Sequence, residues 1–175
     1  MNASPAFCVW LTGLPASGKS SISRELTGLL EVRGIRHVVL ESDVMRRILT
    51  PDPTYDREER DRFYRSLVLV GERIFTSGVP VIFDATANRR AYRDSARQLF
   101  TRFLEVFVQC PGDVCSTRDP KGIYAAAASG KASTVPGIQD AYEPPLAPEI
   151  VVDGRSKPKE NAERIIQRLI ERRYI

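Results

Sequence analysis

The chain has 175 residues, of which 42% are hydrophobic and 27% are charged, and its net charge at pH 7 is +4. This size and composition predict a single globular domain over residues 1–175 and exclude a disordered chain, a collagen-like chain and a disulfide scaffold. The basic residues are dispersed among acidic ones, so the positive charge is weak evidence for nucleic-acid binding. A small anionic substrate explains it equally well.

Neither a secretory signal segment nor an apolar run of membrane-spanning length is evident in the sequence. The three cysteines, Cys8, Cys110 and Cys115, cannot all pair and lack the spacing of metal ligands. Buried free thiols in a reducing compartment are the simpler interpretation. The sequence therefore predicts a cytoplasmic protein without a membrane partner.

The first predicted element is a strand over residues 7–11, and a glycine-rich loop reading Gly-Leu-Pro-Ala-Ser-Gly-Lys-Ser follows at 13–20. The glycines let successive backbone N–H groups converge on phosphates, and the helix predicted over 19–32 adds the positive end of its dipole. This motif predicts binding of a nucleoside triphosphate, with the lysine on the outer phosphates and a serine hydroxyl on Mg²⁺. The residues expected to bind ATP in this segment are Gly13, Leu14, Pro15, Ala16, Ser17, Gly18, Lys19, Ser20 and Ser21.

Four further strands are predicted over 37–40, 79–83, 104–109 and 150–152, separated by helices over 44–49, 56–76, 89–101, 112–117 and 159–173. Continuous apolar strands that alternate with helices indicate a doubly wound parallel α/β sheet of about five strands, covered on both faces. The segment over about 119–148 has no predicted strand and contains several Gly and Pro residues. A connection of this length is typical of a functional lid.

Two aspartates follow predicted strands at the sheet edge where such folds bind ligands. Asp43 comes after the second strand, and Asp84 ends the third. Each has an ordinary structural alternative, because Asp43 could cap the helix that follows and Asp84 could cap or turn the chain. Phosphoryl transfer needs one carboxylate near the metal and another near the acceptor hydroxyl, which favours a functional role for both.

Residues 118–124 read Arg-Asp-Pro-Lys-Gly-Ile-Tyr, and residues 137–145 read Gly-Ile-Gln-Asp-Ala-Tyr-Glu-Pro-Pro. These segments resemble the nucleotide-covering lid of the adenylylsulfate (APS) kinases, which use ATP to phosphorylate the 3′-hydroxyl of APS and give PAPS. The resemblance covers nearly the whole chain and implies a P-loop kinase fold, usually homodimeric. It places Arg46 and Arg60 at substrate-binding arginines, Tyr55 at an aromatic residue that stacks on the substrate adenine, and Arg118 and Lys121 on the ATP side of the lid.

Departures from the family pattern cluster on the acceptor side. Phe63 stands where the family has an asparagine, Ala87 where it has a serine sometimes assigned as a phosphate carrier, and Ser133 and Val135 where it usually has a lysine and a phenylalanine. Phosphate should therefore pass directly from ATP to the acceptor. APS should bind less tightly than in a standard family member, since charge-assisted hydrogen bonds are lost.

The stretch Asp-Ala-Thr at 84–86, followed by Arg89, Arg90 and Arg93, is similar to an element of polynucleotide kinases. It leaves an alternative open, a related kinase retuned to another nucleotide-like or small-metabolite hydroxyl. A polynucleotide 5′-hydroxyl kinase ranks lower. A noncatalytic nucleotide switch also ranks lower, because a binding module would not need two carboxylates around the metal.

These observations predict an APS kinase that uses ATP and Mg²⁺ on a small nucleotide substrate. Asp43 is the residue expected to orient or deprotonate the acceptor hydroxyl. The predicted catalytic residues are Lys19, Asp43 and Asp84, the predicted metal-binding residues are Ser20, Asp43 and Asp84, and the predicted acceptor-binding residues are Asp43, Arg46, Tyr55, Arg60, Phe63 and Ala87.

Overall fold

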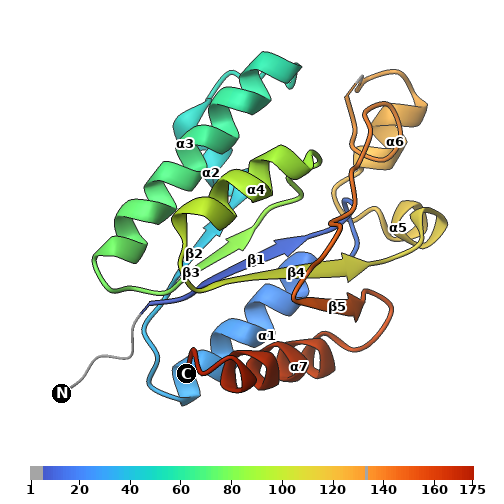
Figure 1. Cartoon of the computed structure of the whole chain (residues 1–175). Coiled ribbons are helices and arrows are strands. Elements are labelled where there is room, and N and C mark those ends of the chain that lie inside the picture. The colour runs from blue at the N-terminus through green and yellow to red at the C-terminus, as the bar shows by residue number, and fades with distance from the viewer. Residues whose placement is uncertain (1–5, 133) are drawn as a thin grey trace.

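A parallel sheet of five strands forms the centre of the computed structural model, which describes residues 6–132 and 134–175 (Figure 1). The strands are β1 (Cys8–Thr12), β2 (Val38–Glu41), β3 (Val81–Asp84), β4 (Phe103–Gln109) and β5 (Ile150–Asp153), in the order β2-β3-β1-β4-β5. The predicted doubly wound α/β sheet is confirmed, and each strand lies within two residues of its expected bounds. The chain forms β2 and β3 on one side of β1 and then crosses to β4 and β5 on the other side. The loop after β1 therefore lies at the switch point where such sheets bind ligands.

Helices cover both faces of the sheet (Figure 1). On one face lie α1 (Lys19–Val32) and α7 (Pro158–Glu171), and on the other lie α2 (Ser42–Leu49), α3 (Arg57–Thr76) and α4 (Arg90–Leu99). Alternating side chains of the first strand supply two separate cores, because successive strand residues point to opposite faces. Val9 and Leu11 pack toward α1 and α7, whereas Cys8 and Trp10 pack toward α3 and α4.

The chain between β4 and β5 lies beyond the carboxyl ends of the strands and contains the segment predicted to be a lid, residues 119–148 (Figure 1). It begins with α5 (Gly112–Arg118) and contains a second helix, α6 (Ile123–Ala128). No helix was predicted at α6, which includes the alanines at 125–128, since a six-residue segment is too short to show periodicity. Gly122, at φ 66°, precedes this helix in the left-handed region.

Parallel register brings the ends of three strands to one level. Glu41 of β2 pairs with Asp84 of β3, and Asp84 pairs with Leu11 of β1. The loop after β1, the start of α2 and the end of β3 therefore share one edge of the sheet. All three cysteines are buried free thiols, as expected, and no helix in the described part of the chain is long and apolar enough to cross a membrane.

Candidate active site

The loop over residues 13–20 is shaped by close backbone packing. A Cβ on Gly13, at φ 154°, would lie 2.5 Å from the carbonyl oxygen of Val108 and 2.9 Å from Ser17 Oγ. Gly18, at φ 105°, is the residue from which α1 begins. Both positions therefore require glycine, and the N-terminal turn of α1 follows directly, which directs backbone N–H groups into the loop.

Lys19 lies inside this loop and is 8% exposed. Its Nζ donates hydrogen bonds to the carbonyl oxygens of Gly13 at 3.0 Å and Leu14 at 2.8 Å. Burial lowers the pKa of the lysine, and the nearby charges of Asp84 and, more weakly, Asp43 act in the opposite direction. The structure thus brings the predicted catalytic lysine and both predicted carboxylates together.

The two aspartates differ in environment, and neither caps a helix. Asp84 is 5% exposed at the end of β3, whereas Asp43 is exposed in the first turn of α2 and forms an ion pair with Lys121 of the lid. The N-cap of α2 is Glu41, without a side-chain cap bond, and α4 begins only at Arg90. The capping alternatives are therefore not seen in the structure.

Oxygen donors for a cation gather at this edge. Ser20 follows Lys19 in the first turn of α1 and is exposed. A hydroxyl and carboxylates are hard oxygen ligands of the kind that Mg²⁺ accepts while keeping several waters and substrate phosphate oxygens. Among residues 6–132 and 134–175 no cluster of three His, Cys, Asp or Glu side chains could hold a metal by itself.

The predicted acceptor residues form a second group, between α2 and α3. The Arg46 guanidinium lies 3.9 Å from the Phe63 ring centroid and 4.9 Å from that of Tyr55, and it forms an ion pair with Glu59. Arg60 Nε donates to the carbonyl oxygen of Tyr55 at 3.0 Å. Tyr55 is 44% exposed, at φ 58°, so its ring borders open space beside two forked cations.

Phe63 and Ala87 lie deeper than the other predicted acceptor residues, and both are fully buried. Phe63 offers its ring face to Arg46. The Ala87 N–H donates to the Tyr64 hydroxyl at 2.9 Å, in a left-handed backbone conformation at φ 42°. Their contribution to an acceptor site would be indirect, through the side chains that they support. Ser133 lies outside the described residues.

The lid contacts the glycine-rich loop directly. Tyr124 of α6 donates its hydroxyl to the carbonyl oxygen of Pro15 at 3.0 Å, and Tyr142 shares a 3.0 Å hydrogen bond with Thr12. Arg118 donates to the carbonyl oxygen of Gly154 at 2.8 Å, next to the loop. Lys121, whose side chain is largely exposed, forms an ion pair with Asp43 of α2, so the lid joins the end of β5, the loop and α2.

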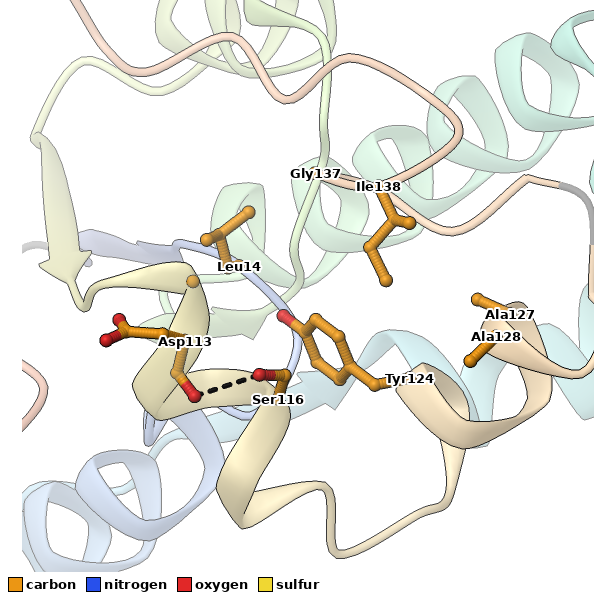
Figure 2. Close-up of a pocket in the computed structure, with 9 residues that line it drawn as sticks. Leu14, Asp113, Ser116, Tyr124, Ala127, Ala128, Gly137 and Ile138 are labelled. Carbon is orange, nitrogen blue, oxygen red and sulfur yellow. Dashed lines mark hydrogen bonds between the residues drawn. The ribbon is translucent and has the colours of Figure 1, made fainter.

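A cavity of about 380 Å³ lies between the loop and the lid (Figure 2). Figure 2 shows the Tyr124 ring between Leu14 of the loop and Ile138 of the lid return. A second cavity, of about 440 Å³, follows the lid over residues 137–142. Gly137, at φ 84°, lies so close to Leu14 that an added Cβ would overlap the leucine side chain. The lid and the loop therefore shape these cavities jointly.

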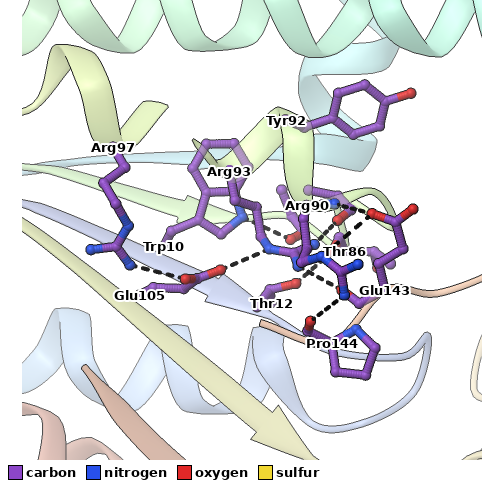
Figure 3. A network of polar contacts seen from close by, with 12 residues as sticks. Trp10, Thr12, Thr86, Arg90, Tyr92, Arg93, Arg97, Glu105, Glu143 and Pro144 are labelled. Carbon is purple, nitrogen blue, oxygen red and sulfur yellow. Dashed lines mark hydrogen bonds and ion pairs between the residues drawn. The ribbon is translucent and has the colours of Figure 1, made fainter. Parts of the chain in front are cut away.

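A buried polar network anchors the far end of the lid, and the sequence analysis missed it (Figure 3). Arg93 of α4, 1% exposed, donates to Glu105 Oε1 at 2.7 Å and to the carbonyl oxygens of Glu143, at 2.6 Å, and Ala87. Glu143 also receives the Arg90 N–H at 2.7 Å. The sign of this network in the sequence was Glu105, a glutamate in the middle of the largely apolar strand β4.

The same network bears on the similarity to polynucleotide kinases. Arg93 forms a buried ion pair with Glu105. Arg90 pairs with Glu143, and Arg89 pairs with Asp61 at 3.5 Å. All three arginines have protein partners that hold α4 to the lid or to α3. The structure therefore gives them anchoring roles and does not favour a polynucleotide acceptor.

Comparison with known proteins agrees with the site. A family model described as adenylylsulphate kinase matches residues 5–153. A probable adenylyl-sulfate kinase of Synechocystis is 37% identical over 168 residues, which cover 95% of each chain. The structure of a Mycobacterium tuberculosis APS kinase, in complex with AMPPNP and APS, matches with a TM-score of 0.90 at 31% identity, covering 95% of this chain and 98% of that one. With the glycine-rich loop, the two aspartates and the lid in one site, the chain belongs to the adenylylsulfate kinase family.

Proposed function

We propose that this protein transfers the γ-phosphoryl group of ATP to the 3′-hydroxyl of APS, forming PAPS. The observation that carries the proposal is the meeting of three groups at one sheet edge: Lys19 in its loop, Asp43 and Asp84 beside it, and Arg46 and Arg60 beyond. A relative of 31% identity, described as a complex with AMPPNP and APS, has the same fold over nearly the whole chain, which supports both substrates.

The loop and Lys19 would hold the triphosphate and neutralise charge that develops on the transferred group. Phosphoryl transfer needs little covalent chemistry from the protein, so catalysis rests on aligning donor and acceptor and on electrostatic stabilisation. Asp43, exposed at the start of α2, would orient or deprotonate the acceptor hydroxyl. Lys121 and Arg118 reach this region from the lid and would close over ATP.

Ser20, Asp43 and Asp84 are the residues that would hold Mg²⁺, directly or through water, together with the phosphates. A bound Mg²⁺ would supply positive charge against the phosphates at this edge. Asp84 is the more buried of the two carboxylates, and its charge raises the pKa of Lys19 more than the charge of Asp43 does. We therefore assign Asp84 mainly to the metal and Asp43 mainly to the acceptor.

Arg46 and Arg60 would bind the anionic end of the acceptor, because planar guanidinium groups match phosphate and sulfate oxygens. Tyr55 would stack on the base. Ala87 has no hydroxyl and is fully buried, which supports direct transfer without a phosphorylated enzyme. Val135 is also buried and has no aromatic ring where the family usually has a phenylalanine, so weaker APS binding is expected.

The decisive experiment measures ATP consumption and product formation with APS, with other nucleotides that carry a free 3′-hydroxyl, and with 5′-hydroxyl oligonucleotides. We expect conversion of APS to PAPS with the highest kcat/KM in the panel. Efficient use of oligonucleotides without turnover of APS would overturn the proposal. A homodimer is expected from the family resemblance and a cytoplasmic location from the sequence, and sedimentation of the purified protein tests the dimer.

A further inference from the structure

Arg60 is bound by the lid as well as by its own neighbourhood. Its Nη1 donates to Asp140 Oδ2 at 2.9 Å, its Nη2 donates to the carbonyl oxygen of Thr134, and its Nε donates to the carbonyl oxygen of Tyr55. The Arg60 side chain is 7% exposed, whereas the Asp140 side chain is 42% exposed. The carboxylate therefore reaches inward from the surface to a buried cation.

The carboxylate that pairs with Arg46 comes from α3 and not from the lid. Glu59 lies on α3, one residue before Arg60, and its second oxygen accepts the Tyr55 N–H at 3.2 Å. This carboxylate belongs to the fixed body of the protein. Asp140 instead belongs to the lid, so its contact with Arg60 exists only while the lid has the observed position.

A tight turn presents Asp140 to the arginine. The Asp140 N–H donates to the carbonyl oxygen of Val135 at 3.2 Å, and its own carbonyl accepts the Gly137 N–H at 2.7 Å. The same carboxylate oxygen that faces Arg60 accepts a second hydrogen bond, at 2.9 Å, from Asn88 Nδ2. Asn88 thus anchors the lid through a contact that does not involve Arg60. The anchoring of the lid and the pairing of Asp140 with Arg60 can therefore be tested separately.

We propose that Asp140 is a specificity-determining residue that competes with the anionic group of the acceptor for the guanidinium of Arg60. This inference rests on the proposed function. An acceptor anion that binds Arg60 must displace or share the Nη1 donor, so the carboxylate raises the KM for anionic acceptors. It also lowers the positive charge of the acceptor site, which disfavours binding of unrelated anions.

The test compares steady-state kinetics of Asp140→Asn and Asp140→Ala with those of Asn88→Ala, which removes the other contact of the same carboxylate. Because a partly exposed ion pair is a modest interaction, the KM for APS should fall about fivefold in Asp140→Ala and less in Asp140→Asn, with the KM for ATP unchanged. Asn88→Ala should leave the KM for APS unchanged or higher.

An unchanged or higher KM for APS in both Asp140 variants would overturn the inference, since Asp140 would then serve only to anchor the lid. A fall of equal size in Asn88→Ala would also overturn it, because general loosening of the lid would explain the effect. Absence of PAPS formation by the unaltered protein would instead refute the proposed function, and the inference with it.

Discussion

The proposed nucleotide side and the proposed acceptor side of the site are built in different ways. Eight consecutive residues, 13–20, form the nucleotide side, and their shape depends on backbone conformation and on close contacts such as that of Gly13 with Val108. The acceptor side uses side chains from α2, α3 and the lid, spread from Asp43 to Asp140. A contiguous backbone loop can be read from a sequence, whereas a dispersed set of side chains depends on packing.

The lid connects these two sides. Tyr124 reaches the loop at Pro15, and Asp140 reaches the acceptor side at Arg60. Lys121 meets Asp43 between them. A change confined to the nucleotide side should alter the KM for ATP, and one confined to the acceptor side should alter the KM for APS. A displacement of the whole lid should alter both.

The largest expected effect is that of Lys19→Ala, on the nucleotide side. Turnover should fall about 10³-fold, because a preorganised cation at the transferred phosphate is lost, while the fold remains intact. ATP consumption with saturating acceptor measures the effect, and thermal unfolding tests the fold. Lys159→Ala, on the exposed surface of α7, is the matched control. Normal turnover by folded Lys19→Ala protein would refute the kinase assignment.

Asp43→Asn probes the boundary between the two sides. Turnover should fall about 10²-fold with ATP affinity changed only a few-fold, as expected for loss of a positioned base. Lys121→Ala breaks the same ion pair but keeps the carboxylate, so its kcat at saturating ATP should fall much less. Equal losses in the two variants, or a lowered melting temperature alone for Asp43→Asn, would contradict the role of Asp43 as base.

Gly154→Ala tests whether the nucleotide side depends on backbone packing. The added Cβ would overlap the carbonyl oxygen of Ser17 and lie 2.9 Å from Cys110 Cβ. The free energy of unfolding should fall by about 1–3 kcal/mol, and the KM for ATP should rise as the loop shifts. Gly112→Ala is the control, since nothing lies within 4 Å of its added Cβ. Equal stability of the two variants in denaturant titrations would show that the contact is relieved without cost.

Tyr55→Ala should give the smallest effect, confined to the acceptor side. Loss of an aromatic face beside Arg46 should raise the KM for APS about fivefold and leave the KM for ATP unchanged. Tyr55→Phe keeps the ring and should stay within about twofold of the unaltered protein. An equal rise in both variants would assign the effect to the hydroxyl and contradict stacking.

The sequence predicted the sheet, the loop and both aspartates, because each depends on local patterns. Strands buried on both faces show as apolar runs, the phosphate loop has fixed spacing, and Asp43 and Asp84 follow strand ends. The short helix α6 was missed, because six residues carry little periodic signal. The buried role of Arg93 was also missed, since an arginine in a helix usually indicates a solvated face.

By itself, the sequence determined the nucleotide loop and the order of strands and helices, for which short-range spacing and periodicity are sufficient. Tertiary structure decided the partners of the arginines. Arg60 and Asp140 lie 80 residues apart in the chain, and Arg93 and Glu143 lie 50 residues apart. Each contact exists only because the lid returns across the carboxyl ends of the strands. Such long-range contacts of charged side chains are set by how buried groups satisfy one another, which no local pattern encodes.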